Sequence, residues 1–362
     1  GFYSNTVEAK FRSQINVPFN LPNDELDAFA EDGFDSVMRL GDNTRVGFSA
    51  GLQGPIPDKT NSTPLGKFFT QSSVPLGVDS TALAAFNYRT NMATAMQPVG
   101  ARNLAMSNAM QNPYLHLVGS ATGSAVGYQS GHTRMRVAAY SGTMNSDTPE
   151  YNYRFSDEKN VSGVVAEVAY ANDDRTASVT IENGVTVEEN SFLGSEASGA
   201  FGIDKSSTYF TGVSGRVGLA DGVALIGNAH LGLTGVGAAD SSIFTGFSSV
   251  MTNAFALGAE FSDVVGAGDT LGLMISQPLR VMRGSAGLTL PMDVAADGSV
   301  LFENRKLNLA PSARELDVES YYQLASGGMS DLSVNAIFRM NPDNDNTAPH
   351  DFTMLTKYKL GF

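Results

Sequence analysis

The chain has 362 residues and a formal net charge of -14, and it contains no cysteine and no tryptophan. An acidic surplus argues against nucleic-acid binding, which needs Lys and Arg to displace counterions from phosphates, and the absence of cysteine excludes disulfides and thiolate metal sites. Only 17% of residues are charged and glycine reaches 38 residues, a balance that favours strands and tight turns over long solvated helices.

The first forty residues are the least regular part of the chain. Residues 6–19 alternate apolar and polar side chains, residues 23–34 carry helix N-cap features, and residues 34–40 are expected to pair with the strand that follows Gly41. We therefore assign residues 1–40 to an N-terminal linker, a passenger remnant or an extra pair of strands. No basic start followed by an apolar run opens the chain, so we expect no signal peptide within it.

Residues 41–362 are predicted to form one domain. Residues 44–54 alternate as a strand, with Val46, Phe48, Ala50 and Leu52 on one face. Residues 54–112 then form a long stretch with Pro, Ser and Met, which we expect to be a long outer loop or a pore segment. Within it, residues 80–90 have the composition of another strand.

From residue 113 onward, alternation with a period of two residues dominates the sequence. Predicted strands cover about 113–128, 133–140, 161–171, 175–184, 209–219, 223–233, 255–261, 270–281, 315–324, 332–340 and 351–362. Their connections alternate between short turns and long polar segments at about 142–160, 185–206, 237–250, 282–312 and 342–350. Outer-membrane barrels have this combination of short periplasmic turns and long outer loops.

These patterns predict an all-β fold, a transmembrane antiparallel up-and-down β-barrel with 12 strands, or 14 if the N-terminal pair is counted. Closure would satisfy the backbone groups that lipid cannot. We expect the bacterial outer membrane as the location, with outer-membrane lipid and lipopolysaccharide as surroundings and no nucleic-acid partner.

The alternation also assigns charged side chains to the lumen. A charged side chain that faced the bilayer midplane would cost about 2 to 4 kcal/mol, so charged residues within strands are expected to point inward and to pair with opposite charges. The predicted lumen-lining charges are Arg134, Arg136, Glu182, Arg216, Glu260, Arg280, Glu315, Asp317, Glu319, Arg339, Lys357 and Lys359. They are expected to line a hydrated passage, to cradle a plug segment, or only to solvate the lumen.

The last strand places Phe352, Met354, Tyr358, Leu360 and Phe362 on one face. An alternating apolar strand with a terminal Phe resembles the C-terminal signal of bacterial outer-membrane proteins. The resemblance implies recognition by the barrel-assembly machinery, a form of strand addition.

Three stretches, NPYLHLVGSATGSAVGYQSG, GDTLGLMISQPLRVMRGSAGLTLP and LNLAPSARELDVESYYQL, resemble the C-terminal translocator barrel of autotransported subtilisin-like serine proteases of alphaproteobacteria. The resemblance covers about residues 40–362. It implies a barrel that anchors an N-terminal passenger and exports it to the cell surface by type V secretion, so that the chain's own passenger segment would be a partner.

No catalytic motif is found. The Gly-Thr-Ser nucleophile motif of subtilases and the Gly-x-Ser-x-Gly elbow are absent. The four histidines are scattered, and we expect His116 and His230 in the lumen, His132 at a turn and His350 in an outer loop. No residues have metal-ligand spacing. We therefore expect no enzyme activity, no metal and no cofactor.

Three functions remain open: an autotransporter translocator, a porin-like channel for small solutes with residues 54–112 as its constriction, and a structural barrel whose outer loops bind a surface partner.

Overall fold

The computed structural model describes residues 36–39, 44–49, 67–76, 80–90, 109–144, 160–172, 176–197, 199–326 and 330–360. Their main element is one sheet of 15 strands, in which neighbours in sequence are neighbours in space. The strands are β1 Ser36–Arg39, β2 Thr44–Ser49, β3 Lys67–Pro75, β4 Ser80–Thr90, β5 Val118–Ser130, β6 Thr133–Met144, β7 Asn160–Ala171, β8 Ala177–Glu189, β11 Ile203–Ala220, β12 Val223–Ala238, β14 Val250–Ser262, β15 Asp269–Arg283, β18 Leu316–Ser326, β19 Ser330–Met340 and β20 Asp351–Leu360.

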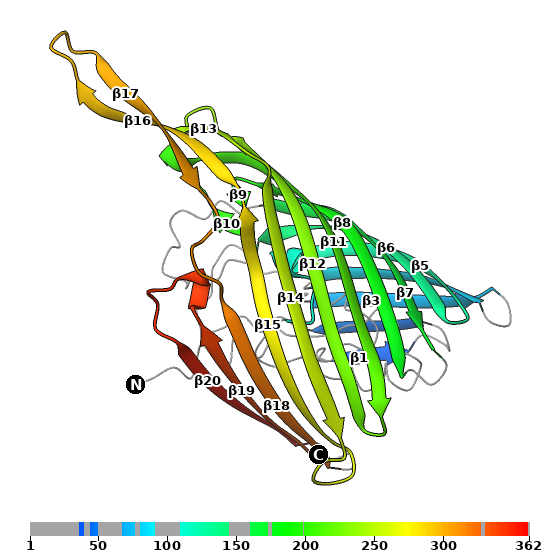
Figure 1. The fold of residues 1–362 in the computed structure, drawn as a ribbon. Helices are drawn as coiled ribbons and strands as arrows, with labels where there is room; N and C mark the ends of the chain where they lie inside the picture. The colour runs from blue at the N-terminus through cyan, green and yellow to red at the C-terminus, as the bar shows by residue number, and fades with distance from the viewer. Residues whose placement is uncertain are drawn as a thin grey trace.

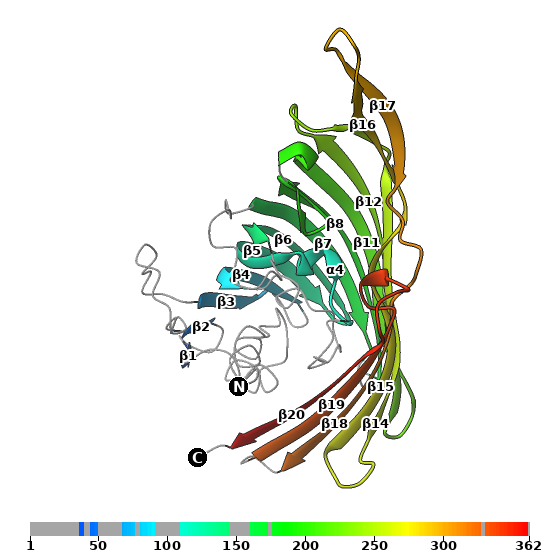
Figure 2. The same cartoon turned by 90° about the vertical axis from the view of Figure 1, so that its left-hand side faces the viewer.

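The sheet is an antiparallel meander that curves strongly about one axis (Figures 1 and 2). Short turns join β5 to β6, β7 to β8, β11 to β12, β14 to β15 and β18 to β19, and the intervening connections are long. All long connections therefore lie at one end of the sheet. Within the described pairings β1 and β20 are the two edges of the sheet.

Eleven strands of the sheet lie after residue 113, as the alternation predicted, and β2 lies in the predicted strand 44–54. The expected pairing before Gly41 is confirmed, because β1 pairs with β2. Two further strands, β3 and β4, lie within residues 54–112, so that stretch is not one uninterrupted loop. The predicted strand at 6–19, the predicted helix at 23–34 and residues 91–108 lie outside the described residues.

The first predicted strand begins later than expected. Pro113–His116 form the short helix α4, because a proline stands in its first turn and the side chain of Asn112 caps it by accepting from the backbone N–H of Tyr114 at 3.0 Å. Strand β5 begins only at Val118. Residues 109–117 therefore lie between β4 and β5, and α4 lies on the concave side of the sheet (Figure 2).

A smaller sheet rises from the end with the long connections. It contains β13 Phe244–Phe247, β16 Ser285–Val294 and β17 Val300–Asn308, in the order β13–β16–β17. The hairpin β16–β17 occupies the segment 282–312 that the sequence pattern predicted as loop. Minor elements of the long connections are β9 Ser191–Phe192, β10 Ser195–Glu196, η2 Gly199–Phe201 and η3 Pro342–Asn344.

Candidate functional site: the polar inner face

Side-chain polarity in the large sheet is opposite to that of a water-soluble protein. Buried positions of the inner face carry charged and hydrogen-bonding side chains, among them Arg134, Arg136, Glu167, Glu182, Asn228, His230 and Glu260. The outer face exposes large apolar side chains, including Val137, Val168, Ile181, Val213, Leu231, Leu257 and Ile275. Such a surface is stable only against hydrocarbon, whereas the inner face suits water.

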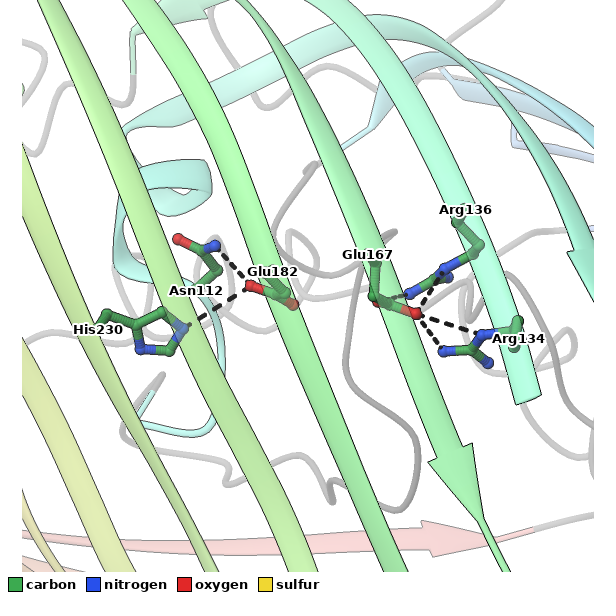
Figure 3. Close-up of polar contacts among 6 residues, drawn as sticks. All are labelled: Asn112, Arg134, Arg136, Glu167, Glu182 and His230. Carbon is green, nitrogen blue, oxygen red and sulfur yellow. Dashed lines mark hydrogen bonds and ion pairs between the residues drawn. The ribbon is translucent and has the colours of Figure 1, made fainter. Parts of the chain in front are cut away.

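On β6 and β7, one carboxylate binds two guanidinium groups. Glu167 accepts hydrogen bonds from Arg134 Nη2 at 2.7 Å and Nε at 3.2 Å, and from Arg136 Nε at 3.1 Å (Figure 3). Arg136 Nη2 also forms an ion pair with it. All three side chains are at most 8% exposed, so the single carboxylate offsets part of the charge of two buried guanidinium groups, and the three side chains together keep a net positive charge.

Glu182 on β8 is the next carboxylate in the same row. It accepts from Asn112 Nδ2 at 2.6 Å, and its Oε2 atom lies 3.8 Å from Nε2 of His230 on β12 (Figure 3). His230 reaches Glu182 across the intervening strand β11, where Gly212 pairs with both residues. A Cβ atom at Gly212 would overlap the imidazole ring, so this contact requires a glycine there.

Glu260 on β14 repeats the arrangement. It forms an ion pair with Arg216 and accepts from the hydroxyl of Tyr321, which reaches it from β18 across Gly272 on β15. Here too a Cβ on the glycine would overlap the ring of the tyrosine. Both carboxylates are thus bound by a side chain that crosses one whole strand.

An acidic group follows on the inner face at β18. Glu315, Asp317 and Glu319 are all buried, and Arg339 lies opposite Asp317 in the pairing of β18 with β19. Arg339 Nη1 donates to Asp351 Oδ2 at 3.1 Å. Burial raises the pKa of Glu315, and a hydrogen bond from the backbone N–H of Asp343 at 2.8 Å opposes that shift. Acidic side chains at β18 therefore face the same lumen as the arginine pair of β6.

The remaining predicted lumen charges have different placements. Arg280 donates to the backbone carbonyls of Pro311 at 2.8 Å and Ala313 at 3.0 Å, and so fixes the connection before β18. Two register shifts in the pairing of β14 with β15 break the strict alternation on which its lumen assignment was based. Lys357 and Lys359 pair with Ser333 and Asp331 in backbone register.

The predicted assembly face is described in part. Phe352 and Met354 are 64% and 60% exposed, on the face away from the lumen. Tyr358 and Leu360 occupy the same register parity, and Phe362 lies outside the described residues. Recognition by assembly machinery stays a prediction.

Residues 109–118, here called the inner segment, are seated on the polar face. The hydroxyl of Tyr114 is 2.8 Å from that of Thr252 on β14, and its ring stacks on Phe210 of β11 with centroids 5.0 Å apart. Asn228 on β12 donates to the carbonyl of Ala109 at 2.6 Å. Tyr114, Leu115 and Val118 belong to one buried apolar cluster, and Met110 belongs to another that includes Tyr321.

The histidines have structural surroundings. His230 faces Glu182 as described, His132 lies at the β5–β6 turn against Tyr170 with ring centroids 5.7 Å apart, and His350 lies against Phe338 at the same distance. His116 is the last residue of α4 rather than part of a strand. Among the described residues, no group of three or more acidic or histidine side chains is arranged to hold a metal ion.

The sequence pattern did not predict Glu167, Glu188 or the role of the inner segment. Glu167 lies between Ala166 and Val168, and the parity that predicted Glu182 would have placed it inward as well. Glu188 is buried and accepts from Ser191 Oγ at 3.2 Å and from the backbone N–H groups of Leu193 and Gly194 at 3.1 and 2.9 Å. It fixes the loop after β8, an end-of-strand role that alternation does not reveal.

An apolar outer face, a charged inner face, and alternating short and long connections together define an outer-membrane-type β-barrel wall. Within the described residues, no helix has the length and apolarity needed to cross a membrane.

No family model matches the sequence, and no curated protein matches it. Among solved structures, the chain is similar to a high-pH structure of OprB from Pseudomonas putida. The TM-score is 0.49 at 13% sequence identity, over 82% of this chain and 73% of that chain.

Proposed function

We propose that the chain forms a hydrophilic passage for small polar solutes across the bacterial outer membrane, with the inner segment as its constriction. The supporting observation is the seating of that segment. It is part of the connection between β4 and β5, and both ends of that connection are strands of the wall. It also forms hydrogen bonds with β8, β12 and β14 on the lumen face.

The charges around the inner segment support a selective passage. The arginine pair of β6 and the acidic group of β18 lie buried in different parts of the inner face, so charges of both signs contribute to the electric field within the passage. Polar solutes can orient their dipoles in such a field and form favourable contacts, so they cross the passage more easily than apolar solutes, which form none. No catalytic role follows from these groups, and the chain is proposed to be a channel rather than an enzyme.

Single-channel conductance of the purified barrel in planar bilayers tests the passage. We expect steady conductance in the unchanged protein and a larger one in Tyr114→Ala, because the substitution removes the hydrogen bond to Thr252 and the stacking on Phe210 that seat the inner segment. The matched control is Tyr209→Ala on the outer face, where the side chain is 65% exposed. Equal conductance in Tyr114→Ala and the unchanged protein would contradict the assignment of a constriction.

A translocator of an autotransporter is the second candidate. Two of the stretches that resemble this family meet in the fold, because Arg280 of the SQPLR stretch binds the carbonyls of Pro311 and Ala313 beside the RELD stretch. The reading frame upstream of Gly1 discriminates between the candidates. A subtilase-like region there favours the translocator, and a signal peptide directly before Gly1 favours the channel.

A further inference from the structure

The hairpin β16–β17 projects beyond the barrel wall, at the end of the sheet away from the C-terminus (Figures 1 and 2). In the small sheet, β16 pairs with β13 on one side and with β17 on the other, so β17 is the free edge within the described pairings. Every residue of β17 is exposed.

This edge lacks two of the features by which proteins usually protect a free strand, a short length and a proline, although it carries the charged residues Glu303, Arg305 and Lys306. The strand has nine residues and no proline, and Leu301, Phe302 and Leu307 are 51%, 64% and 46% exposed. A free edge of this length pairs readily with another strand. Beyond Leu288 the hairpin is two-stranded, and a two-stranded ribbon in water is only marginally stable. The hairpin is therefore suited to a strand that adds to β17.

The sequence of β17, VLFENRKLN, is complementary to itself in antiparallel register. If Asn304 lies opposite Asn304 of a second copy, then Leu301 lies opposite Leu307 and Glu303 lies opposite Arg305. These pairs share one face of the sheet, since their positions differ by even numbers. The two apolar pairs flank two opposite-charge pairs, both favourable across strands.

The opposite face is complementary in the same register. Phe302 lies opposite Lys306, an aromatic ring against a cation, and Val300 lies opposite Asn308. A shift of the register by two residues would place Glu303 opposite Glu303 or Arg305 opposite Arg305, so the charges favour a single alignment.

We propose that β17 is a docking edge for a second copy of this chain. The two β17 strands pair about a two-fold axis at Asn304 and join two small sheets into one. Because antiparallel pairing reverses the strand direction, the two hairpins project toward each other from barrels that point in opposite directions (Figure 1). Such an interface is isologous, because the same surface serves on both copies. In the single chain Glu303 and Arg305 bind each other at 3.1 Å, and in the pair each side chain also meets its counterpart on the second copy.

Disulfide formation tests the register, and the chain contains no cysteine that would interfere. In Asn304→Cys the two Cα atoms lie about 4.5–5.5 Å apart across the axis, within the range of a disulfide, so we expect a covalent dimer under mild oxidation in detergent micelles. Asn308→Cys is the matched control on the same strand and face. Its Cα atoms would lie roughly 26 Å apart at about 3.3 Å per residue, so we expect no covalent dimer from this variant under the same oxidation.

Charge reversal tests the pairing without cysteine. Glu303→Arg and Arg305→Glu each place like charges opposite each other, so we expect each to weaken dimerisation at least tenfold by mass photometry or light scattering. The double variant Glu303→Arg/Arg305→Glu restores opposite pairs and is expected to restore the dimer. Barrel folding is followed in every variant by the heat-dependent gel shift.

Two results would overturn the proposal. One is equal cross-linking of Asn304→Cys and Asn308→Cys. The other is an oligomeric state, whether dimer or monomer, that is the same in the unchanged protein and in every charge variant. Neither result bears on conductance, so the proposed channel is tested separately.

Discussion

At the scale of single residues, buried carboxylates organise the inner face. Glu167 and Glu182 lie directly opposite each other in the pairing of β7 with β8. Two acidic side chains at such a distance would repel, but Glu167 is bound by two arginines, and Glu182 is bound by Asn112 and faces His230. Each carboxylate therefore depends on its own set of partners.

We expect Glu167→Gln to lower the free energy of unfolding by about 3 kcal/mol, because buried guanidinium groups lose the carboxylate that compensates them. Asp351→Asn is the control, since the Arg339–Asp351 pair is 33% and 47% exposed and an exposed pair contributes less than about 1 kcal/mol. Urea unfolding in lipid vesicles measures both values. Equal losses would mean that Glu167 has no special role.

The ionisation of Tyr114 predicts a pH dependence of the constriction. Burial raises the pKa of this phenol to about 12, whereas a solvated tyrosine has a pKa of about 10. Below about pH 10 the phenol is protonated whether or not Tyr114 is seated on the wall, so the seated position keeps its full stabilisation. This stabilisation is lost as the pH rises through the pKa of the phenol in the seated position. We expect conductance to rise over that interval in the unchanged protein and not in Tyr114→Phe, as recorded in bilayers at stepped pH.

At the scale of elements, the short turns are fixed by their own side chains. In the β14–β15 turn the carboxylate of Asp269 accepts from the backbone N–H groups of Val264, Val265 and Gly266 at 2.6, 2.8 and 2.8 Å. The hydroxyl of Tyr322 on β18 donates to it at 2.8 Å. One side chain thus closes the turn and joins it to the next strand.

Asp269→Ala is expected to destabilise the barrel by about 2 kcal/mol, because it leaves several donors without their acceptor. Hydrogen exchange at Val264–Gly266 would show faster exchange of these amides. Asp297→Ala removes a comparable acceptor for Ser299 in the β16–β17 turn. Since that turn lies outside the barrel wall, its loss is expected to leave barrel unfolding unchanged, and an equal effect would contradict the role of Asp269.

Most strands, and the side of the sheet on which most charged residues lie, were predictable, since the alternation of apolar and polar residues follows the alternation of hydrocarbon and lumen sides along a strand. The binding partners were not, because His230 and Tyr321 cross a strand to reach their carboxylates, and such contacts depend on register and on a glycine between them. The contacts of Arg280 were not predictable either, since the bulged pairing of β15 is invisible in the sequence. The hairpin β16–β17 was not predictable as a pair of strands, because β16 contains Gly287 and Pro291 and the apolar residues of β17 occupy both of its faces.

At the scale of the whole molecule, the outer surface matches a hydrocarbon layer. A charge placed at its middle should be much more costly than one near its edge. We expect Leu231→Arg in β12 to reduce folding into bilayers by about 2 to 4 kcal/mol, and Leu219→Arg beside the β11–β12 turn by less than about 1 kcal/mol. Both leucines are well exposed, at 51% and 61%, so depth is the main difference. Equal folded fractions would exclude a membrane around this face.

The row of contacts from β6 to β12 has a mechanical consequence. Arg136, Glu167, Glu182, Gly212 and His230 stand at one level across five adjacent strands. If β6, β7, β8 or β12 slipped lengthwise by two residues, its side chain in this row would move about 7 Å from its partner. Sliding of these five strands past one another is thereby opposed, so under lateral pressure from the bilayer this part of the wall resists shear as a unit.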